Sequence, residues 1–348
     1  MLARSLPRVE YFDCELPSAR RQMADPEAFL RTLRGKRVVL DEVHRLPEPT
    51  ELLKIAADHF PRTRILATGS STLQASARFR DTLAGRKAEV WLTPMVAADS
   101  RDFGAPDLAR RLRHGGLPPF FLDPDPPERD YQEWMDAYWA RDIQELFRLE
   151  RRAGFRRLLE LCLVRSGGMF EATAYAGPCE VSRPTIANYL AVLEATSVVH
   201  VVRPFARGRA GEIVAAPKVY AFDTGFVASV RGWHDLRPDD CGILWEHLVL
   251  NEIHASRQSR DVQYWRDTRG HEVDFVLAPK RGAPIAIECK WRADAFAWEG
   301  LLAFRRRHPA GANWLVAPDV ERPYVIRRAD VEVECIGLAE CGRRVATR

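Results

Sequence analysis

The chain has 348 residues, of which 46% are hydrophobic and 29% charged, with a formal net charge of +4 and a pI near 8.7. This composition suits a globular protein of about two or three domains and excludes a disordered or fibrous chain. The apolar runs fall far short of the roughly twenty residues that a membrane span needs, and the N-terminus lacks a signal-peptide segment, so we expect no membrane association and a cytoplasmic location. Seven scattered cysteines without CxxC spacing predict reduced thiols.

An apolar stretch that ends in two acids, RVVLDEVHRL at 37–46, predicts a buried strand of a parallel sheet. Asp41 and Glu42 would emerge at its carboxyl edge, where α/β sheets bind ligands. In a P-loop NTPase the first acid holds Mg²⁺ through its water shell, and the second polarises the water that attacks the γ-phosphate. The alternative is a strand that ends in an acidic turn.

The next two segments predict a helix at 49–60 and a second strand at 64–71, which complete one βαβ unit. Thr68 and Ser70 would lie beside Asp41, where a polar side chain can sense the γ-phosphate, or they are ordinary residues of a strand end. Arg86, ahead of an expected strand at 88–92, either stabilises phosphate charge or is a solvated turn residue.

A phosphate-binding loop of the form GxxxxGK[ST] is missing from the sequence. Such a loop surrounds the β- and γ-phosphates with backbone amides and one lysine. We therefore interpret residues 1–104 as a partial P-loop NTPase sheet, truncated before its first strand, phosphate loop and first helix. We expect this chain to bind MgATP weakly or not at all.

The middle of the chain predicts helices and a winged helix. Residues 105–150 indicate a helical lid or linker, and residues 151–225 have the element order of a winged helix, with Ser182 as the cap of its third helix. The mildly basic charge is compatible with DNA but does not establish it. The alternative is a winged helix used for packing or for a partner protein. Residues expected to contact DNA lie on the third helix and the wing: Arg183, Thr185, Asn188, Tyr189, Arg203, Arg207 and Arg209.

Residues 240–348 carry a second set of charged side chains on a predicted helix and two predicted strands. Glu288 and Lys290 share one face of a strand because side chains alternate along it, and Asp274 can meet them across a turn. Two carboxylates that hold a metal, with a lysine that orients water or stabilises charge, suit a Mg²⁺-dependent phosphodiesterase. The alternative is a charged hairpin. The pattern resembles the PD-(D/E)xK nucleases, an α/β fold like that of restriction endonucleases, with Glu246 as accessory acid; many such domains bind or scaffold without cleavage.

Segments along nearly all of the chain together resemble the bacterial and archaeal AAA-family ATPases that carry the C-terminal domain DUF4143. The resemblance implies Walker B acids at Asp41 and Glu42, a nuclease-like end domain, and ATP and Mg²⁺ as cofactors, with Asp41, Asp274 and Glu288 as metal ligands. The matching segments are VVLDEVHRLPE, ILATGSS, LAGR, HGGLP, WMDAYWARDI, VSRPTIANYLAVLEAT, PKVYAFDTG, WEHLVLNEI, YWRDTRGHEVDFVL and IAIECK.

Three functions follow as alternatives. The first is an ATPase-type protein of the AAA family that acts on or near DNA. The second is a Mg²⁺-dependent nuclease. The third is a non-enzymatic winged-helix protein with a DNA-binding or regulatory role. DNA is the expected partner, and a homo-oligomer is left open.

Overall fold

The computed structural model describes residues 6–69, 83–104, 107–125, 128–138, 143, 151–206, 216–279 and 282–347. The chain divides into two compact units, Met1–Glu89 with Ala140–Arg148, and Val90–Trp139 with Leu149–Arg348. Within the residues described, none of the helices is both long enough and apolar enough to cross a membrane. All seven cysteines are buried and lie outside any disulfide.

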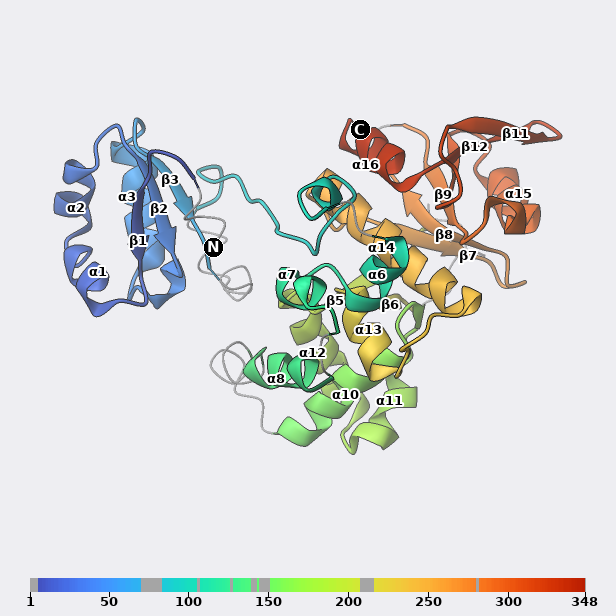
Figure 1. The fold of residues 1–348 in the computed structure, drawn as a ribbon, viewed down its shortest axis with the longest axis horizontal. Coiled ribbons are helices and arrows are strands. Elements are labelled where there is room, and N and C mark those ends of the chain that lie inside the picture. The colour runs from blue at the N-terminus through green and yellow to red at the C-terminus, as the bar shows by residue number, and fades with distance from the viewer. Residues whose placement is uncertain are drawn as a thin grey trace. The chain divides into compact units, whose positions relative to one another are not determined.

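The first unit contains a parallel sheet of three strands in the order β1 (Glu10–Asp13), β2 (Arg37–Asp41) and β3 (Arg64–Ala67) (Figure 1). The central strand is β2, whose three middle residues are buried, as its apolar sequence predicts. Helix α3 (Pro49–His59) connects β2 to β3, so the expected βαβ unit is present.

Two short helices precede the acid-bearing strand. Helix α1 spans Pro17–Gln22 and α2 spans Pro26–Thr32. The side chain of Asp25 caps α2 by accepting a hydrogen bond from the backbone N–H of Ala28 at 3.0 Å. Apolar residues of α2, β2 and α3, including Leu30, Leu40 and Leu52, form one core.

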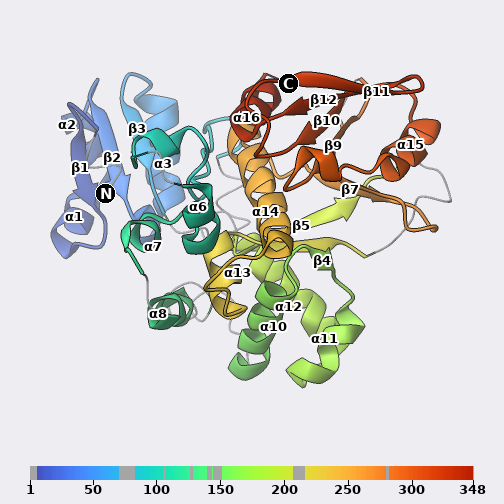
Figure 2. The same cartoon turned by 45° about the vertical axis from the view of Figure 1, so that its right-hand side comes forward.

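The second unit contains a nine-stranded sheet in the order β11-β12-β10-β9-β8-β7-β5-β6-β4. Strand β5 pairs in parallel with β7, with Arg203 opposite Gln263. This pairing joins the region predicted as a winged helix to the C-terminal region within one sheet (Figure 2). The strands are β4 (Gly168–Met169), β5 (Val199–Pro204), β6 (Lys218–Ala221), β7 (Gln263–Arg266), β8 (Glu272–Leu277), β9 (Ile285–Cys289), β10 (Asn313–Val316), β11 (Tyr324–Arg328) and β12 (Val331–Ile336).

The helices of this unit fall into three groups along the chain. The first group is α6 (Leu108–His114), α7 (Pro118–Leu122) and α8 (Glu128–Tyr138), and the second is α10 (Arg152–Val164), α11 (Ala172–Cys179) and α12 (Arg183–Ala195). The third is α13 (Thr224–Val230), α14 (Pro238–Arg257), α15 (Trp298–Arg307) and α16 (Leu338–Ala346). Ser182 caps α12 by accepting the Thr185 N–H at 3.3 Å, as predicted.

One expectation for the segments before α10 differs from the structure. Residues 88–92 are not a strand, because Val90 and Leu92 are 72% and 80% exposed and the Trp91 N–H donates to the side chain of Gln258 instead of to a neighbouring strand. Helix α6 packs against α13 and α14, so this part of the expected lid or linker is built into the second unit.

Candidate functional sites

Asp41 ends the central strand of the first unit between hydroxyl groups from both neighbouring strands. Its two carboxylate oxygens accept hydrogen bonds from Tyr11, on β1, and from Thr68, which follows β3. The Thr68 hydroxyl oxygen also accepts the backbone N–H of Glu42 at 3.3 Å. Polar side chains from three adjacent parallel strands therefore converge at the carboxyl edge of this sheet.

Glu42 turns the chain out of the sheet immediately after Asp41. Its φ of 53° lies in the left-handed region, which a non-glycine residue seldom adopts, and a 3-10 turn at Val43–Arg45 follows. Burial raises the pKa of Glu42, and the charge of Asp41 raises it further, while His44, whose Nδ1 lies 3.1 Å away, opposes both effects. A carboxylate with a raised pKa, next to an acid expected from the sequence to hold a metal, is suited to accept a proton from water.

The structure does not bring Arg86 to this edge. Its Nε lies 2.7 Å from an oxygen of Asp58, near the C-terminal end of α3. Because α3 returns the chain from the carboxyl end of β2 to the start of β3, this ion pair lies at the opposite end of the βαβ unit. Ser70, the second expected sensor residue, lies outside the described residues.

The C-terminal region brings together the four charged residues expected from the sequence. Glu246 lies on α14, Asp274 on β8, Glu288 on β9, and Lys290 directly after β9. The Lys290 Nζ lies 3.2 Å from an oxygen of Asp274 and 3.2 Å from an oxygen of Glu288. The antiparallel pairing of β8 with β9 produces this arrangement, and Asp274 also accepts the Cys289 N–H at 2.8 Å.

Burial acts to raise the pKa of both carboxyl groups, Asp274 and Glu288, and the neighbouring charges then move the two pKa values apart. The pKa of Glu288 is raised well above its usual value, first by burial and then by the charge of Asp274. Burial also acts to raise the pKa of Asp274, but the ammonium groups of Lys290 and Lys218 outweigh it and hold that pKa low. The two carboxyl groups therefore titrate apart, with Asp274 the more readily ionised.

Three residues of this cluster were not expected from the sequence, namely Lys218, Tyr220 and Glu272. Lys218, on β6, is 5% exposed, and its Nζ lies 2.5 Å from Glu272 and 3.4 Å from Glu246. Tyr220, two residues further on, donates its hydroxyl hydrogen bond to Glu246. The signal for Lys218 is in the segment PKVYAFDTG, because a lysine in an otherwise apolar strand needs a carboxylate partner.

The donor set fits one hydrated divalent cation. No group of three or more His, Cys, Asp or Glu side chains in the described part of the chain is arranged to hold a metal ion. Mg²⁺ needs only one or two carboxylates, since it keeps several of its waters. Asp274 and Glu288 meet this requirement, and Glu288 would release its proton on binding the metal.

The residues expected to contact DNA differ in their exposure and in whether another side chain already holds them. Arg183 and Asn188 are exposed on α12, while Thr185 is half-buried with its hydroxyl 2.8 Å from that of Ser182. Arg203 is exposed, but its guanidinium donates to both oxygens of Glu194 at 2.7 and 2.8 Å. Arg207 and Arg209 lie outside the described residues.

The outward position expected for Tyr189 is wrong. The residue is 4% exposed, its ring packs edge-on against Phe155 with centroids 5.3 Å apart, and its hydroxyl donates to the Arg151 carbonyl at 3.3 Å. Tyr189 lies three residues after Ile186 and four before Leu193, both fully buried, so it falls on the inner stripe of the helix.

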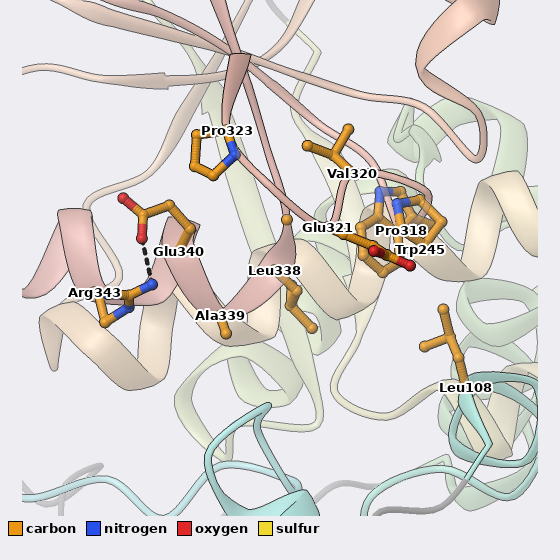
Figure 3. A pocket seen from close by; sticks show the side chains of 11 residues that line it. Leu108, Trp245, Pro318, Val320, Glu321, Pro323, Leu338, Ala339, Glu340 and Arg343 are labelled. Carbon is orange, nitrogen blue, oxygen red and sulfur yellow. Dashed lines mark ion pairs between the residues drawn. The ribbon is translucent and has the colours of Figure 1, made fainter.

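A separate cavity of about 330 Å³ lies between α16 and the loop after β10. Trp245 and Leu338 line it, and Glu340 and Arg343 form an ion pair of 2.5 Å at its side (Figure 3). None of the four charged residues expected from the sequence lines this cavity. It is therefore distinct from the cluster around Lys290.

Family models match three successive parts of the chain. An AAA domain matches residues 1–99, the domain of unknown function DUF8612 matches residues 105–237, and the domain of unknown function DUF4143 matches residues 241–331. The sequence is also 28% identical over 299 residues to two proteins described as uncharacterized, from Mycobacterium bovis and Mycobacterium tuberculosis. The match covers 83% of this chain and 66% of each relative, so the chain spans just under two thirds of their length.

Among solved structures, a half-complex from the tetradecameric assembly of Thermococcus gammatolerans McrB AAA+ hexamers with bound McrC is similar at 7% identity. The match covers 83% of this chain and 80% of that chain. Its TM-score of 0.26 is too low to show a shared fold. The N-terminal part of the chain, residues 1–99, is similar to AAA domains, and residues 241–331 are similar to the domain of unknown function DUF4143.

Proposed function

We propose that the protein is an AAA-family ATPase that acts on or near DNA, with Asp41 and Glu42 on the magnesium and water side of its nucleotide site. The observation that carries the proposal is the position of Asp41 at the end of β2, hydrogen-bonded to Thr68 from the next strand. An acid there can hold Mg²⁺ through water, and a hydroxyl on the adjacent strand can respond to the γ-phosphate through the same carboxylate. Glu42 would orient the attacking water.

The phosphate side of such a site needs a loop that these 348 residues do not contain. The chain without that loop is expected to bind MgATP weakly or not at all, because no lysine and no row of backbone amides would surround the phosphates. Titration calorimetry with MgATP measures this directly, and micromolar affinity would contradict the expectation.

The proposal itself is tested by placing a strand, a GxxxxGK[ST] loop and a helix ahead of Met1 and measuring ATP hydrolysis. Glu42→Gln should lower the hydrolysis rate by about 100-fold or more while MgATP still binds. Asp41→Asn should weaken the magnesium dependence of binding. Glu27→Gln is the matched control, because Glu27 is exposed on α2 and pairs with Arg31. Equal hydrolysis by the extended protein and its Glu42→Gln variant would overturn the proposal.

A second candidate function is Mg²⁺-dependent cleavage of a phosphodiester. The contacts of Lys290 with both Asp274 and Glu288 favour it, because they place a cation beside two potential metal ligands. A bound Mg²⁺ would act as a Lewis acid and lower the pKa of its water. Asp274 and Glu288 would hold the ion, and Lys290 would orient the water or stabilise the developing negative charge.

The nicking of supercoiled plasmid in the presence of Mg²⁺ tests this second function. Lys290→Ala should abolish nicking, whereas Lys36→Ala should not, since Lys36 is an exposed lysine paired with Glu10 in the first unit. Nicking that survives Lys290→Ala would have another origin and would rule out this site as the nuclease.

The proposed association with DNA rests on the middle of the chain. Helices α10, α11 and α12 with strands β4, β5 and β6 follow the order of a winged helix, which supports that assignment. Arg183 and Asn188 on the exposed side of α12 are suited to phosphate and base contacts. A non-enzymatic protein of this kind would bind DNA with strong salt dependence and without turnover.

A further inference from the structure

Lys218 reaches the cluster around Lys290 from a strand that precedes the C-terminal region in sequence. It lies on β6, which pairs with β5, and only 5% of it is exposed. Its Nζ contacts Glu246 at 3.4 Å and Glu272 at 2.5 Å, and lies 5.6 Å from the centre of the Tyr264 ring. A buried ammonium group of this kind is a fixed positive charge of the site.

The acids of the site divide into two sets, each with its own cation. Lys290 contacts Asp274 and Glu288, whereas Lys218 contacts Glu246 and Glu272. Glu272 has a further partner, because its second oxygen lies 3.0 Å from the guanidinium of Arg266. Tyr220 donates to the same Glu246 oxygen that Lys218 contacts. The second set of acids is therefore already neutralised by side chains of the protein.

We propose that this site takes one divalent metal ion, on Asp274 and Glu288, and that the Lys218 ammonium stands in place of a second ion at Glu246. This rests on the proposed phosphodiesterase function. Two-metal sites hold their ions about 3.5–4 Å apart on shared acids, so Glu246 would have to serve the second ion. A dication bonded to Glu246 would meet the ammonium that contacts the same carboxylate, and this repulsion is weakly screened in a buried site.

Lys218 is a positioning residue in this arrangement. It holds Glu246 in place together with Tyr220, and it supplies positive charge that needs no dissociable ion. The substrate class that fits is a phosphate diester, whose negative charge would be balanced by one metal ion and two lysines. Because β6 belongs to the region predicted as a winged helix, this region would complete the metal site of the C-terminal region.

The number of Mn²⁺ ions bound per chain tests the inference without any measurement of activity. Free Mn²⁺ is followed by electron paramagnetic resonance during titration, and all variants carry Asp41→Asn so that the first unit contributes no ion. We expect one ion per chain, none after Asp274→Asn, and a rise to two after Lys218→Met. Lys218→Arg retains the charge and should stay at one ion, as should Lys36→Met, which removes an exposed lysine paired with Glu10.

The outcomes separate this inference from the proposed function. Two ions in the protein with Lys218 intact would overturn the inference and leave the phosphodiesterase proposal standing. No bound ion would overturn the proposed function, and the inference with it. If the Lys218→Met variant still binds only one Mn²⁺ ion per chain, Lys218 does not exclude a second ion and the inference is wrong. If Lys218→Met does not fold, the Glu246→Gln variant tests the inference instead. This variant should still bind one Mn²⁺ ion per chain, because Glu246 is not a metal ligand in the proposed site. Loss of that ion would overturn the inference.

Discussion

Asp223 accepts a hydrogen bond at 2.6 Å from the backbone N–H of Gly116. The same carboxylate accepts the Gly225 N–H at 2.8 Å and is 3% exposed. A β-carbon on Gly225 would fall 2.4 Å from the carbonyl oxygen of His114, so only glycine fits there. The segments HGGLP and PKVYAFDTG are thus two halves of one buried contact that fixes α6 against α13.

Asp223→Ala should lower the free energy of unfolding of the second unit by about 2–4 kcal/mol, because two buried N–H groups would lose their acceptor. All 9 tryptophans lie at or after residue 91, so tryptophan fluorescence in urea follows this unit alone. Asp125→Ala is the control, since Asp125 is 84% exposed in its ion pair with Arg113, and should change stability by less than about 0.5 kcal/mol. Equal urea midpoints for the two variants would contradict the prediction.

Tyr189 should behave as a core residue. Tyr189→Ala is expected to cost about 3–5 kcal/mol of unfolding free energy through the cavity it leaves, whereas Tyr189→Phe should cost about 1 kcal/mol for the lost hydrogen bond to Arg151. Urea unfolding measures both values. The Tyr189→Phe variant should bind DNA with the same affinity as the unsubstituted protein. A lower affinity would mean that Tyr189 contacts DNA after all.

Binding to duplex DNA, followed by fluorescence anisotropy over a range of salt concentrations, should distinguish two arginines. Arg183→Ala is expected to reduce the slope of log affinity against log salt by about 1, the effect of one lost phosphate contact. Arg203→Ala should reduce it less, because Glu194 holds both ends of its guanidinium. The opposite order would place the DNA on the β5 side of the region.

Two buried histidines predict a loss of stability in mild acid. Burial lowers the pKa of His247 to about 4 and that of His254 to about 3. An unfolded histidine has a pKa near 6.5, so below about pH 6.5 the unfolded chain binds protons that the folded protein does not. The stabilisation is therefore complete above about pH 6.5 and is lost as the pH falls toward 4 and then 3.

His254→Asn should make the unfolding free energy of the second unit less steep between about pH 6 and pH 4, by up to about 1.4 kcal/mol per pH unit. Urea unfolding at a series of pH values gives this slope. His234→Asn is the matched control, because His234 is exposed. An unchanged slope in His254→Asn would mean that His254 takes up its proton in the folded protein.

The parts of the fold that could be predicted from the sequence depend on neighbours in the chain. The strand that ends at Asp41 and the helix after it follow from local apolar spacing, and the Ser182 cap follows from a four-residue pattern. The convergence of Asp274, Glu288 and Lys290 could also be expected, because two strands joined by a short segment pair in antiparallel fashion.

The parts that could not be predicted depend on contacts between distant segments. Lys218 and Glu246 are separated by 28 residues, and no local pattern specifies that β6 and α14 meet. Tyr189 was placed on the wrong side of α12 because its neighbours include both exposed polar and buried apolar residues, and one tyrosine suits either side. The exposure of Val90 and Leu92 likewise contradicts the strand that their apolar character indicates.

The parallel pairing of β5 with β7 bears on how the protein can be dissected. A fragment that begins at residue 240 would leave β7 with an unpaired edge, which invites aggregation, and would also lack Lys218 and Tyr220. Glu246, half-buried on α14, would then lose the two side chains that contact its carboxylate. A fragment intended for soluble expression and crystallisation of the C-terminal region should therefore start before α10, so that it retains both β5 and β6.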